Sequence, residues 1–309
     1  MGRHIYIIGP TGVGKTALAI ALALRFQGEI ISADSRQVYR RMDIGTAKPT
    51  PEEQRQAPHH LLDLLDLGDT FDLATFLSLA RAAVGDIRSR DALPIVAGGT
   101  GQYIWALRDG WTVPQVPPDP AFRESKHLKA EEIGHEALHQ ELQAIDPARA
   151  AGIDPRNVRR VIRALEIHHA TQQSPSQLGG RNEVESHALV LGLTMEREEL
   201  YRRIDERVDR MMDQGFLDEV RALVALDLDL TQGALASPGY RELGQHLSGG
   251  WSLDEAIQRT KSQTHRLARR QYSWFKLGDP RITWLDALDD DLAGTASARL
   301  EEYLSRSHP

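Results

Sequence analysis

Short apolar runs alternate with amphipathic stretches along the first third of the chain. The runs His4–Ile8, Glu29–Ala33 and Leu93–Ala97 have the length and composition of buried parallel strands. Between them, the Ala- and Leu-rich stretch Gly14–Phe26 and the stretch Phe71–Arg90 predict helices. This alternation predicts an α/β fold, in which a parallel sheet is flanked by helices and the crossovers are right-handed.

The pattern changes at residues 111–120, WTVPQVPPDP, which contain four prolines and predict a linker. The polar stretches 121–150 and 154–170 then predict helices, and a Gly/Ser/Gln-rich connection follows over 171–186. We therefore expect a small helical domain at residues 117–186.

An apolar run, Ala188–Leu193, predicts a strand that returns the chain to the sheet. Helical patterns dominate from Glu196 onward, and Ile282–Leu285 predicts a last strand. The expected organisation is a core made of residues 1–116 and 187–309, interrupted by the helical insertion.

Composition narrows the class of protein. The 309 residues include no Cys, which excludes disulfides and thiolate metal sites and suits a cytoplasmic protein. The longest apolar run, Ala17–Leu24, is far shorter than the roughly 20 residues of a membrane span, so no membrane association is expected. The net charge is −7, yet Arg259–Lys276 carries six basic residues and no acidic one. That basic segment favours contact with a phosphate backbone.

One loop matches the phosphate-binding pattern G-x-x-x-x-G-K-[ST] at every fixed position: GPTGVGKT, residues 9–16. Its glycines let backbone N–H groups converge on a phosphate at a helix N-terminus, while Lys15 adds a charge and Thr16 can bind Mg²⁺. ATP is the usual partner of such a loop, but the motif alone does not select the phosphate.

Polar residues also follow the second and third predicted strands. Asp34 can be a ligand of Mg²⁺ or a base that accepts a proton from a nucleophile, and its spacing does not separate the two roles. Thr100, in the turn Gly98–Gly101, can donate a hydrogen bond to an anionic oxygen. Because the carboxyl ends of parallel strands meet at one edge of a sheet, these loops and the phosphate loop should share one crevice.

Arginines recur on two predicted helices. In RNVRRVIRALE, Val158, Val161, Ile162 and Leu165 form the expected buried face, with Arg159, Arg163 and Glu166 opposite. In LYRRIDERVDRMM, Arg203, Arg207 and Arg210 alternate with acidic residues, which favours a solvated face. For the pair His59 and His60, we expect a structural or hydrogen-bonding role instead of a zinc site.

Together these stretches resemble the tRNA dimethylallyltransferase family, also called tRNA isopentenyltransferases, of the bacterial type. The resemblance rests on GPTGVGKT, DSRQVY, DIGTAKP, PHHLLD, IVAGGTGQYI, DPRNVRRVIRALEI, RIDERVDRMMDQGF, GYREL and HRLARRQYSWFK, in the family's order. Gln102 and the pair Ser237-Pro238 depart from the family's usual residues. The zinc-binding extension of eukaryotic members is missing.

The resemblance implies a P-loop NTPase-like fold and transfer of a dimethylallyl group from dimethylallyl diphosphate to tRNA. The acceptor would be the exocyclic N6 amine of the adenosine 3′ of the anticodon. It implies Mg²⁺ as cofactor, with Thr16 as ligand, and the anticodon loop as partner; we expect a monomer.

The resemblance also assigns residues. It makes Asp34 the general base and Thr100 its catalytic partner. The diphosphate would be held by Gly9, Pro10, Thr11, Gly12, Val13, Gly14, Lys15 and Thr16, and by Arg207, in place of the solvated role. The expected tRNA contacts are Asp34, Ser35, Arg36, Gln37, Thr100, Arg123, Arg159, Arg160, Val161, Ile162, Arg163, Ala236, Ser237, Pro238, Gly239, Tyr240 and Arg241.

Two other functions fit parts of the sequence. A small-molecule kinase would use the phosphate loop and an Mg²⁺-binding aspartate, but it gives no reason for the arginine helices. A non-catalytic RNA-binding protein would explain the arginines, but not Lys15 and Asp34 at one crevice.

Overall fold

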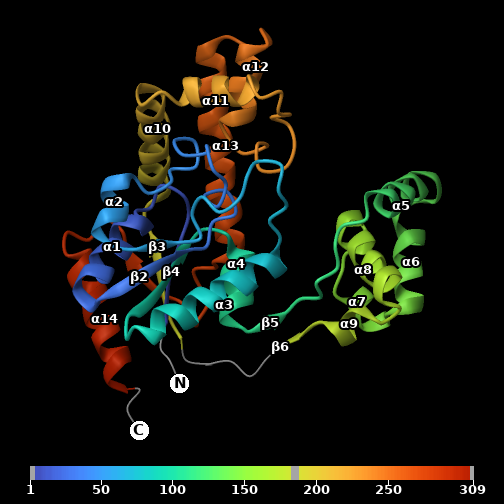
Figure 1. The fold of residues 1–309 in the computed structure, drawn as a ribbon, viewed down its shortest axis with the longest axis horizontal. Coiled ribbons are helices and arrows are strands. Elements are labelled where there is room, and N and C mark those ends of the chain that lie inside the picture. Colours follow the sequence, from blue (N-terminus) through green and yellow to red (C-terminus); the bar gives the residue numbers. More distant parts are fainter. Residues whose placement is uncertain (1–3, 182–187, 307–309) are drawn as a thin grey trace. The chain divides into compact units, whose positions relative to one another are not determined.

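A six-stranded parallel sheet forms the centre of the computed structural model, which describes residues 4–181 and 188–306. Its strands are β1 (Ile5–Ile8), β2 (Gly28–Ser32), β3 (His59–His60), β4 (Leu93–Gly98), β7 (Leu189–Thr194) and β8 (Thr283–Asp286). They are ordered β3-β2-β4-β1-β7-β8 (Figure 1). The predicted α/β fold and the five predicted strands are confirmed. The two-residue strand β3 was not predicted, because two histidines carry no apolar signal.

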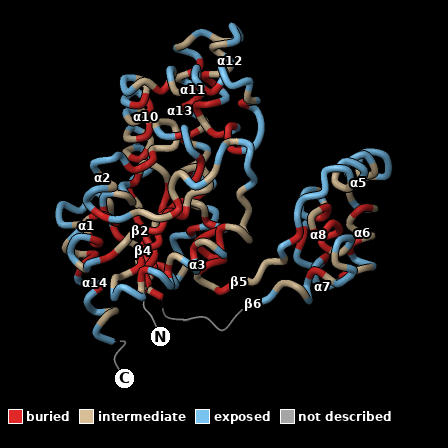
Figure 2. The backbone as a smooth tube through the Cα atoms, in the orientation of Figure 1, coloured by how far each residue is buried: buried red, intermediate tan, exposed pale blue. Residues whose placement is uncertain are grey.

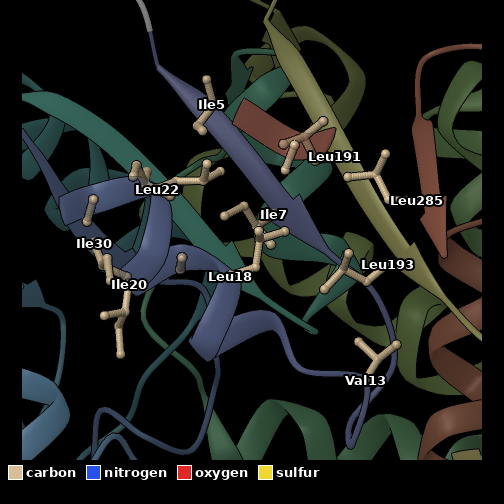
Figure 3. Packing of buried hydrophobic residues seen from close by; sticks show 14 of the residues in the cluster. Ile5, Ile7, Val13, Leu18, Ile20, Leu22, Ile30, Leu191, Leu193 and Leu285 are labelled. Carbon is tan, nitrogen blue, oxygen red and sulfur yellow. The ribbon is translucent and has the colours of Figure 1, made fainter. Parts of the chain in front are cut away.

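Burial on both faces explains why the central strands are so apolar. Ile5 and Ile7 of β1 pack with Leu191 and Leu193 of β7 and with Leu22 of α1 (Figure 3). Helices α1 (Lys15–Phe26) and α14 (Leu292–Arg306) cover this face of the sheet. Helix α3 (Leu73–Ser89) packs against β2 and β4 on the opposite face. The carboxyl ends of β1, β2 and β4 are left for loops.

Beyond those loops, the helices α10 (Arg197–Asp213), α11 (Phe216–Val224), α12 (Tyr240–Leu247) and α13 (Leu253–Trp274) pack against one another. Helix α2 (Pro51–Gln56) contacts α1, and α4 (Gly101–Arg108) follows β4. A second core joins α10 to α13 with the segment that follows β2, through Met211, Phe216, Tyr240 and Val38. The basic segment predicted at Arg259–Lys276 lies mainly on α13. None of the described helices is long and apolar enough to cross a membrane.

The chain separates into two compact units, each with its own buried core (Figure 2). One consists of Met1–Leu107 and Glu185–Pro309, the other of Arg108–Val184. The second unit contains α5 (Pro120–Ile133), α6 (His135–Ile145), α7 (Pro147–Ala151), α8 (Val158–Thr171) and α9 (Pro175–Leu178). Leu138, Leu142 and Leu165 are among its core residues.

The entry to the second unit differs from the predicted linker. Residues Trp111–Thr112 form strand β5, which pairs antiparallel with β6 (Gly180–Arg181). The chain therefore enters and leaves this unit through paired strands, and the unit begins before residue 117. Residues 182–187, the end of the predicted connection, lie outside the described part of the chain.

Candidate active site

The phosphate loop leads from β1 into α1 with a backbone that only glycine tolerates at its ends. Gly9 has φ +144°, and a Cβ there would lie 2.6 Å from the Leu193 carbonyl oxygen. Gly14, the N-cap of α1, has φ +101°. Side chains do not cap the N-terminus of α1, and its first turn contains Lys15 and no acidic residue. Its N–H groups can therefore bind an anion.

Two cations at this loop are destabilised by their own burial. Lys15 Nζ donates to the Pro10 carbonyl at 2.8 Å. Burial lowers the pKa of Lys15 to about 8, an effect that Asp34 opposes and Arg207 reinforces. Burial also lowers the pKa of Arg207 to about 10, again opposed by Asp34. An anion in the loop would relieve both cations.

Arg207 is held toward the loop by one hydrogen bond, from Nη2 to Thr11 Oγ1 at 2.5 Å. Its buried Nε makes no hydrogen bond within the described chain. Arg203 and Arg210, one turn away on α10, instead pair with Glu199 and Glu206. The solvated stripe expected from the residue pattern is therefore wrong at Arg207, which turns inward because Asp34 and the loop lie there.

The loops after β2 and β4 are linked directly. Ser35 N–H donates to Thr100 Oγ1 at 3.2 Å, and Thr100 N–H donates to the Ala33 carbonyl at 3.3 Å. Asp34 Oδ1 accepts from Arg36 N–H at 2.8 Å, which closes a tight turn. Asp34 also interacts electrostatically with Lys15 and Arg207. The three loops that follow β1, β2 and β4 thus meet at one place.

A residue that the sequence analysis did not single out joins two of these loops. Gln271 of α13 accepts from Thr11 N–H through Oε1 at 2.8 Å and donates through Nε2 to the Gly99 carbonyl at 3.1 Å. Gln271 lies on the buried stripe of α13 with Ala268 and Phe275. A polar residue in register with such a stripe is the signal that could have found it.

The segment after Asp34 is folded on itself. Gln37 accepts from Ser32 Oγ at 2.9 Å and donates to the Thr46 and Ala47 carbonyls at 3.3 and 3.1 Å. The buried Lys48 Nζ binds the Tyr39 carbonyl at 2.8 Å, and its ammonium also meets the carboxylates of Asp43 and Asp63. The amide of Gln37 is thus hydrogen-bonded within the protein at both ends, although Ser35, Arg36 and Gln37 are all partly exposed.

The stretch 236–241 is largely buried at its centre. Ser237, Gly239 and Tyr240 are buried, while Ala236 and Arg241 are exposed and Pro238 is intermediate. The Tyr240 hydroxyl donates to Glu219 Oε1 at 2.6 Å, and burial raises the pKa of Tyr240. Glu219 also accepts from the backbone N–H groups of residues 43–45. Tyr240 therefore fastens this stretch to the segment after Asp34.

Comparisons with known proteins agree with this arrangement. The IPP transferase family matches residues 37–278, and the isopentenyl transferase family matches residues 3–65. The chain is 51% identical over 300 residues to the tRNA dimethylallyltransferase of Thermomicrobium roseum, covering 97% of this chain and 91% of that one. The enzyme of the same name from Geobacillus thermodenitrificans is 45% identical, covering 98% and 96%. The chain belongs to the tRNA dimethylallyltransferase family.

Solved structures from the family share the fold. The tRNA isopentenylpyrophosphate transferase of Bacillus halodurans is 38% identical, covers 100% of both chains and has a TM-score of 0.72. A eukaryotic dimethylallyltransferase acting on tRNA is 29% identical, with a TM-score of 0.83, and covers 100% of this chain and 81% of its own. The P-loop NTPase-like α/β fold predicted from the sequence is confirmed.

In this family member the four arginines of the second unit that were expected to contact tRNA fall into two groups. Arg159 and Arg160 are exposed on α8. Arg123 and Arg163 bind Glu166, with Arg123 Nε 2.7 Å from Oε1 and Arg163 Nη1 2.5 Å from Oε2.

The expectation that Glu166 lies on the exposed face of α8 is wrong. Its side chain is 1% exposed, because the two arginines and the Asp119 N–H satisfy its oxygens. Val161 and Ile162, also expected to touch tRNA, are 0% and 2% exposed in the core of this unit. Their side chains offer no surface to RNA, since packing against α6 takes the whole apolar face of the helix.

The two histidines have the hydrogen-bonding role predicted for them. His59 Nδ1 is 2.8 Å from the Ala57 carbonyl, and His60 Nε2 is 2.7 Å from Glu29 Oε2. Glu29 also binds Arg90. These contacts join β3 to β2 and to the end of α3.

Replacing Glu166 by Gln should weaken the second unit. Although burial raises the pKa of Glu166, hydrogen bonds from Arg123, Asp119 and Arg163 bring it below its ordinary value. The carboxylate therefore stabilises the fold above an unfolded pKa of about 4.3, and this stability is lost as the pH falls through the folded pKa. We expect Glu166→Gln to cost about 1.5–3 kcal/mol at pH 7.

Amide hydrogen exchange along α5 and α8 in the full chain measures this effect. The matched control is Glu132→Gln on the exposed face of α5, which should leave the exchange unchanged. Equal protection in the two variants would show that the buried carboxylate contributes nothing.

Proposed function

We propose that this chain transfers a dimethylallyl group from dimethylallyl diphosphate to the N6 amine of the adenosine 3′ of the anticodon in tRNA. Membership of the tRNA dimethylallyltransferase family supports the reaction. The observation that carries the assignment of the site is the meeting of Lys15, Arg207 and Asp34 at the phosphate loop. Two cations suit a leaving diphosphate, and the carboxylate suits an amine that must lose a proton.

On the donor side, the loop Gly9–Thr16 binds the diphosphate through its N–H groups, Lys15 and Arg207. The allylic C–O bond breaks as negative charge accumulates on the diphosphate oxygens. Donors fixed in place by the fold stabilise that charge more in the transition state than in the bound substrate. The hydrogen bond from Arg207 to Thr11 orients the guanidinium before the donor arrives.

On the acceptor side, Asp34 is the general base. The lone pair of the adenine amine is delocalised into the ring, so the amine is a poor nucleophile. As the new C–N bond forms, Asp34 takes the proton and the diphosphate departs with the electrons of the C–O bond. Thr100 supports this step, because its hydroxyl accepts the Ser35 N–H and fixes the turn that carries Asp34.

Mg²⁺ fits the donors available at this loop. The described residues contain no group of three His, Cys, Asp or Glu that could hold a metal by itself. Mg²⁺ commonly binds through a hydroxyl or carboxylate together with substrate phosphates and waters, and Thr16 supplies that hydroxyl. The ion would add positive charge at the leaving diphosphate.

Residues of each unit contact the tRNA. In the first unit, the acceptor side is lined by Asp34, Ser35, Arg36, Gln37, Thr100, Ala236, Ser237, Pro238, Gly239, Tyr240 and Arg241. Gln37 and Tyr240 contribute indirectly, because their side chains fix the backbone of the neighbouring segments. In the second unit, Arg159 and Arg160 contact phosphates, and Arg123 and Arg163 shape the same face. The target base must leave its stack, which is cheaper in a loop of unpaired bases than in a duplex.

Phosphate contacts make tRNA affinity depend on salt. In the double variant Arg159→Gln/Arg160→Gln, we expect the slope of log K against log salt to become less negative by roughly 0.7 for each arginine removed. Arg156→Gln is the control, since Arg156 is already paired with Asp154. Filter binding from low to high salt measures the slopes. Identical slopes in wild type and double variant would exclude these two arginines.

The lowered pKa of Lys15 predicts a pH limit on donor capture. The diphosphate needs the charged lysine, which the free enzyme loses as the pH rises through about 8. We expect kcat/KM for dimethylallyl diphosphate to fall about tenfold per pH unit above that point. In the complex the diphosphate raises the pKa of Lys15, so kcat should stay level to higher pH.

Lys15→Arg provides the check on this pH limit. Its guanidinium stays charged, so the alkaline fall in kcat/KM should vanish even if the rate is lower. A fall at the same pH in Lys15→Arg would assign the limit to another group.

One assay tests the reaction itself. The protein is incubated with unmodified tRNA, Mg²⁺ and either dimethylallyl diphosphate or ATP, and nucleosides are analysed by mass. Prenylated adenosine with the first donor is the expected product. If ATP instead loses its γ-phosphate and no adenosine is prenylated, the result would favour a kinase over a prenyltransferase. We also propose that the protein acts as a monomer and that it works in the cytoplasm, a reducing compartment that a chain without Cys suits.

A further inference from the structure

Gln271 connects the two sides of the candidate active site. Its side chain is buried, with the residue 9% exposed, and both ends of its amide are hydrogen-bonded to backbone. Oε1 accepts the Thr11 N–H of the phosphate loop, and Nε2 donates to the Gly99 carbonyl beside Thr100. Thr11 and Gly99 lie about ninety residues apart in the chain, and the amide of Gln271 bridges them.

The two contacts need a side chain that both accepts and donates, as an amide does. Thr11 offers a donor and Gly99 offers an acceptor, so the residue between them must both accept and donate. A carboxylate only accepts and a thioether makes neither bond well. The contact is also close: a Cβ on Gly99 would lie 2.2 Å from Gln271 Nε2. A side chain at position 99 would therefore clash with the glutamine amide, which explains the glycine there.

The helix that carries Gln271 is fixed on both sides. Trp105 Nε1 of α4 donates to the Trp274 carbonyl at 3.0 Å, and a Cβ on Gly101 would lie 2.3 Å from Trp274 Cβ. The Tyr272 hydroxyl is 3.1 Å from Thr194 Oγ1, at the end of β7. The C-terminal end of α13 is thus held in place by contacts with α4 and β7, and Gln271 contacts the two loops from there.

We infer that Gln271 is a positioning residue that sets the separation between the diphosphate and the general base. On one side it holds Thr11, whose hydroxyl also receives Arg207. On the other it holds Gly99, next to Thr100, which binds Ser35 beside Asp34. This inference rests on the proposed function of those groups, and it adds that a residue touching neither substrate controls their alignment.

The first test is Gln271→Met, which keeps the length of the side chain and removes both hydrogen bonds. A displacement of about 1 Å in a reacting geometry can cost on the order of 10²-fold in rate, so we expect single-turnover transfer to slow by about 30-fold. Affinities for dimethylallyl diphosphate and for tRNA should change by less than about 3-fold. The control is Gln258→Met, the same change on an exposed position of α13.

A double variant separates alignment from general damage. If Gln271 acts by placing Asp34, its removal matters much less once the base is gone. In the Asp34→Asn background, we expect Gln271→Met to slow transfer by less than about 5-fold. A full 30-fold effect in that background would overturn the inference, as would a loss that appears only in substrate affinity. By contrast, an Asp34→Asn enzyme with the wild-type rate would overturn the proposed role of Asp34.

A second variant covers failure of the first to fold, which circular dichroism detects. Gln271→Glu keeps the size of the side chain and the acceptor for Thr11, but loses the donor to Gly99. We expect it to transfer slowly at saturating substrates. A folded Gln271→Glu enzyme with the wild-type single-turnover rate would overturn the inference, because the link between the two loops would then be dispensable.

Discussion

An Asp34→Asn enzyme should transfer the prenyl group about 10²- to 10⁴-fold more slowly than wild type, with both substrates bound. Asn keeps an oxygen that can accept the Arg36 N–H, so the turn after β2 should persist. What disappears is the capacity to take a proton from the amine. Single-turnover rates at saturating donor and tRNA measure the step directly.

Asp229→Asn is the matched control for this substitution. Asp229 closes a similar turn by accepting the Thr231 N–H at 2.8 Å, but it is exposed and shows no interaction with Lys15 or Arg207. Its variant should transfer at the wild-type rate. A wild-type rate for Asp34→Asn would contradict the assignment of the base.

The same variant decides between the two roles that the sequence leaves open for Asp34. If Asp34 binds Mg²⁺, its loss lowers the affinity for the ion, and a higher Mg²⁺ concentration partly restores binding by mass action. A missing base is not replaced in this way. We therefore expect the rate of Asp34→Asn to stay low across a titration with Mg²⁺. Recovery at high Mg²⁺ would make Asp34 a metal ligand.

The sheet and its loops could be predicted because the signal for them is local. Buried strands such as β1 are apolar throughout, and the polar residues Asp34 and Thr100, which follow β2 and β4, fall at one edge by the geometry of parallel strands. The short strands β3 and β5 were not predicted, since two residues are too few to show a periodic pattern.

Glu166 and Gln271 show why some buried polar residues were not predicted. A polar residue on an amphipathic helix is read as exposed, and each of these is buried only because its partners come from elsewhere in the chain. Arg123 lies 43 residues from Glu166, and Thr11 lies 260 residues from Gln271. Arg207 had the same difficulty: its inward direction depends on Asp34 and the phosphate loop.

Lys15→Met should lower kcat/KM for dimethylallyl diphosphate by about 10³-fold, because removing a fixed donor of charge to a leaving oxyanion typically costs 10²–10³ in rate, and weaker binding adds to it. Affinity for tRNA should change by less than about 3-fold. Lys129→Met is the control, since Lys129 pairs with Glu141 in the second unit, away from the phosphate loop in the chain. Steady-state kinetics with varied donor measures both variants.

The partition of that loss tests what the phosphate loop does in this family member. In a phosphoryl transferase, the lysine of the loop stabilises the group that moves. Here the diphosphate stays in the loop and carbon moves, so Lys15 should matter most while the C–O bond breaks. The loss should therefore appear in the single-turnover rate at saturating donor as well as in KM. A Lys15→Met enzyme with wild-type kcat and only a raised KM would mean that the loop merely binds the donor, leaving Arg207 and Mg²⁺ to stabilise the departing charge.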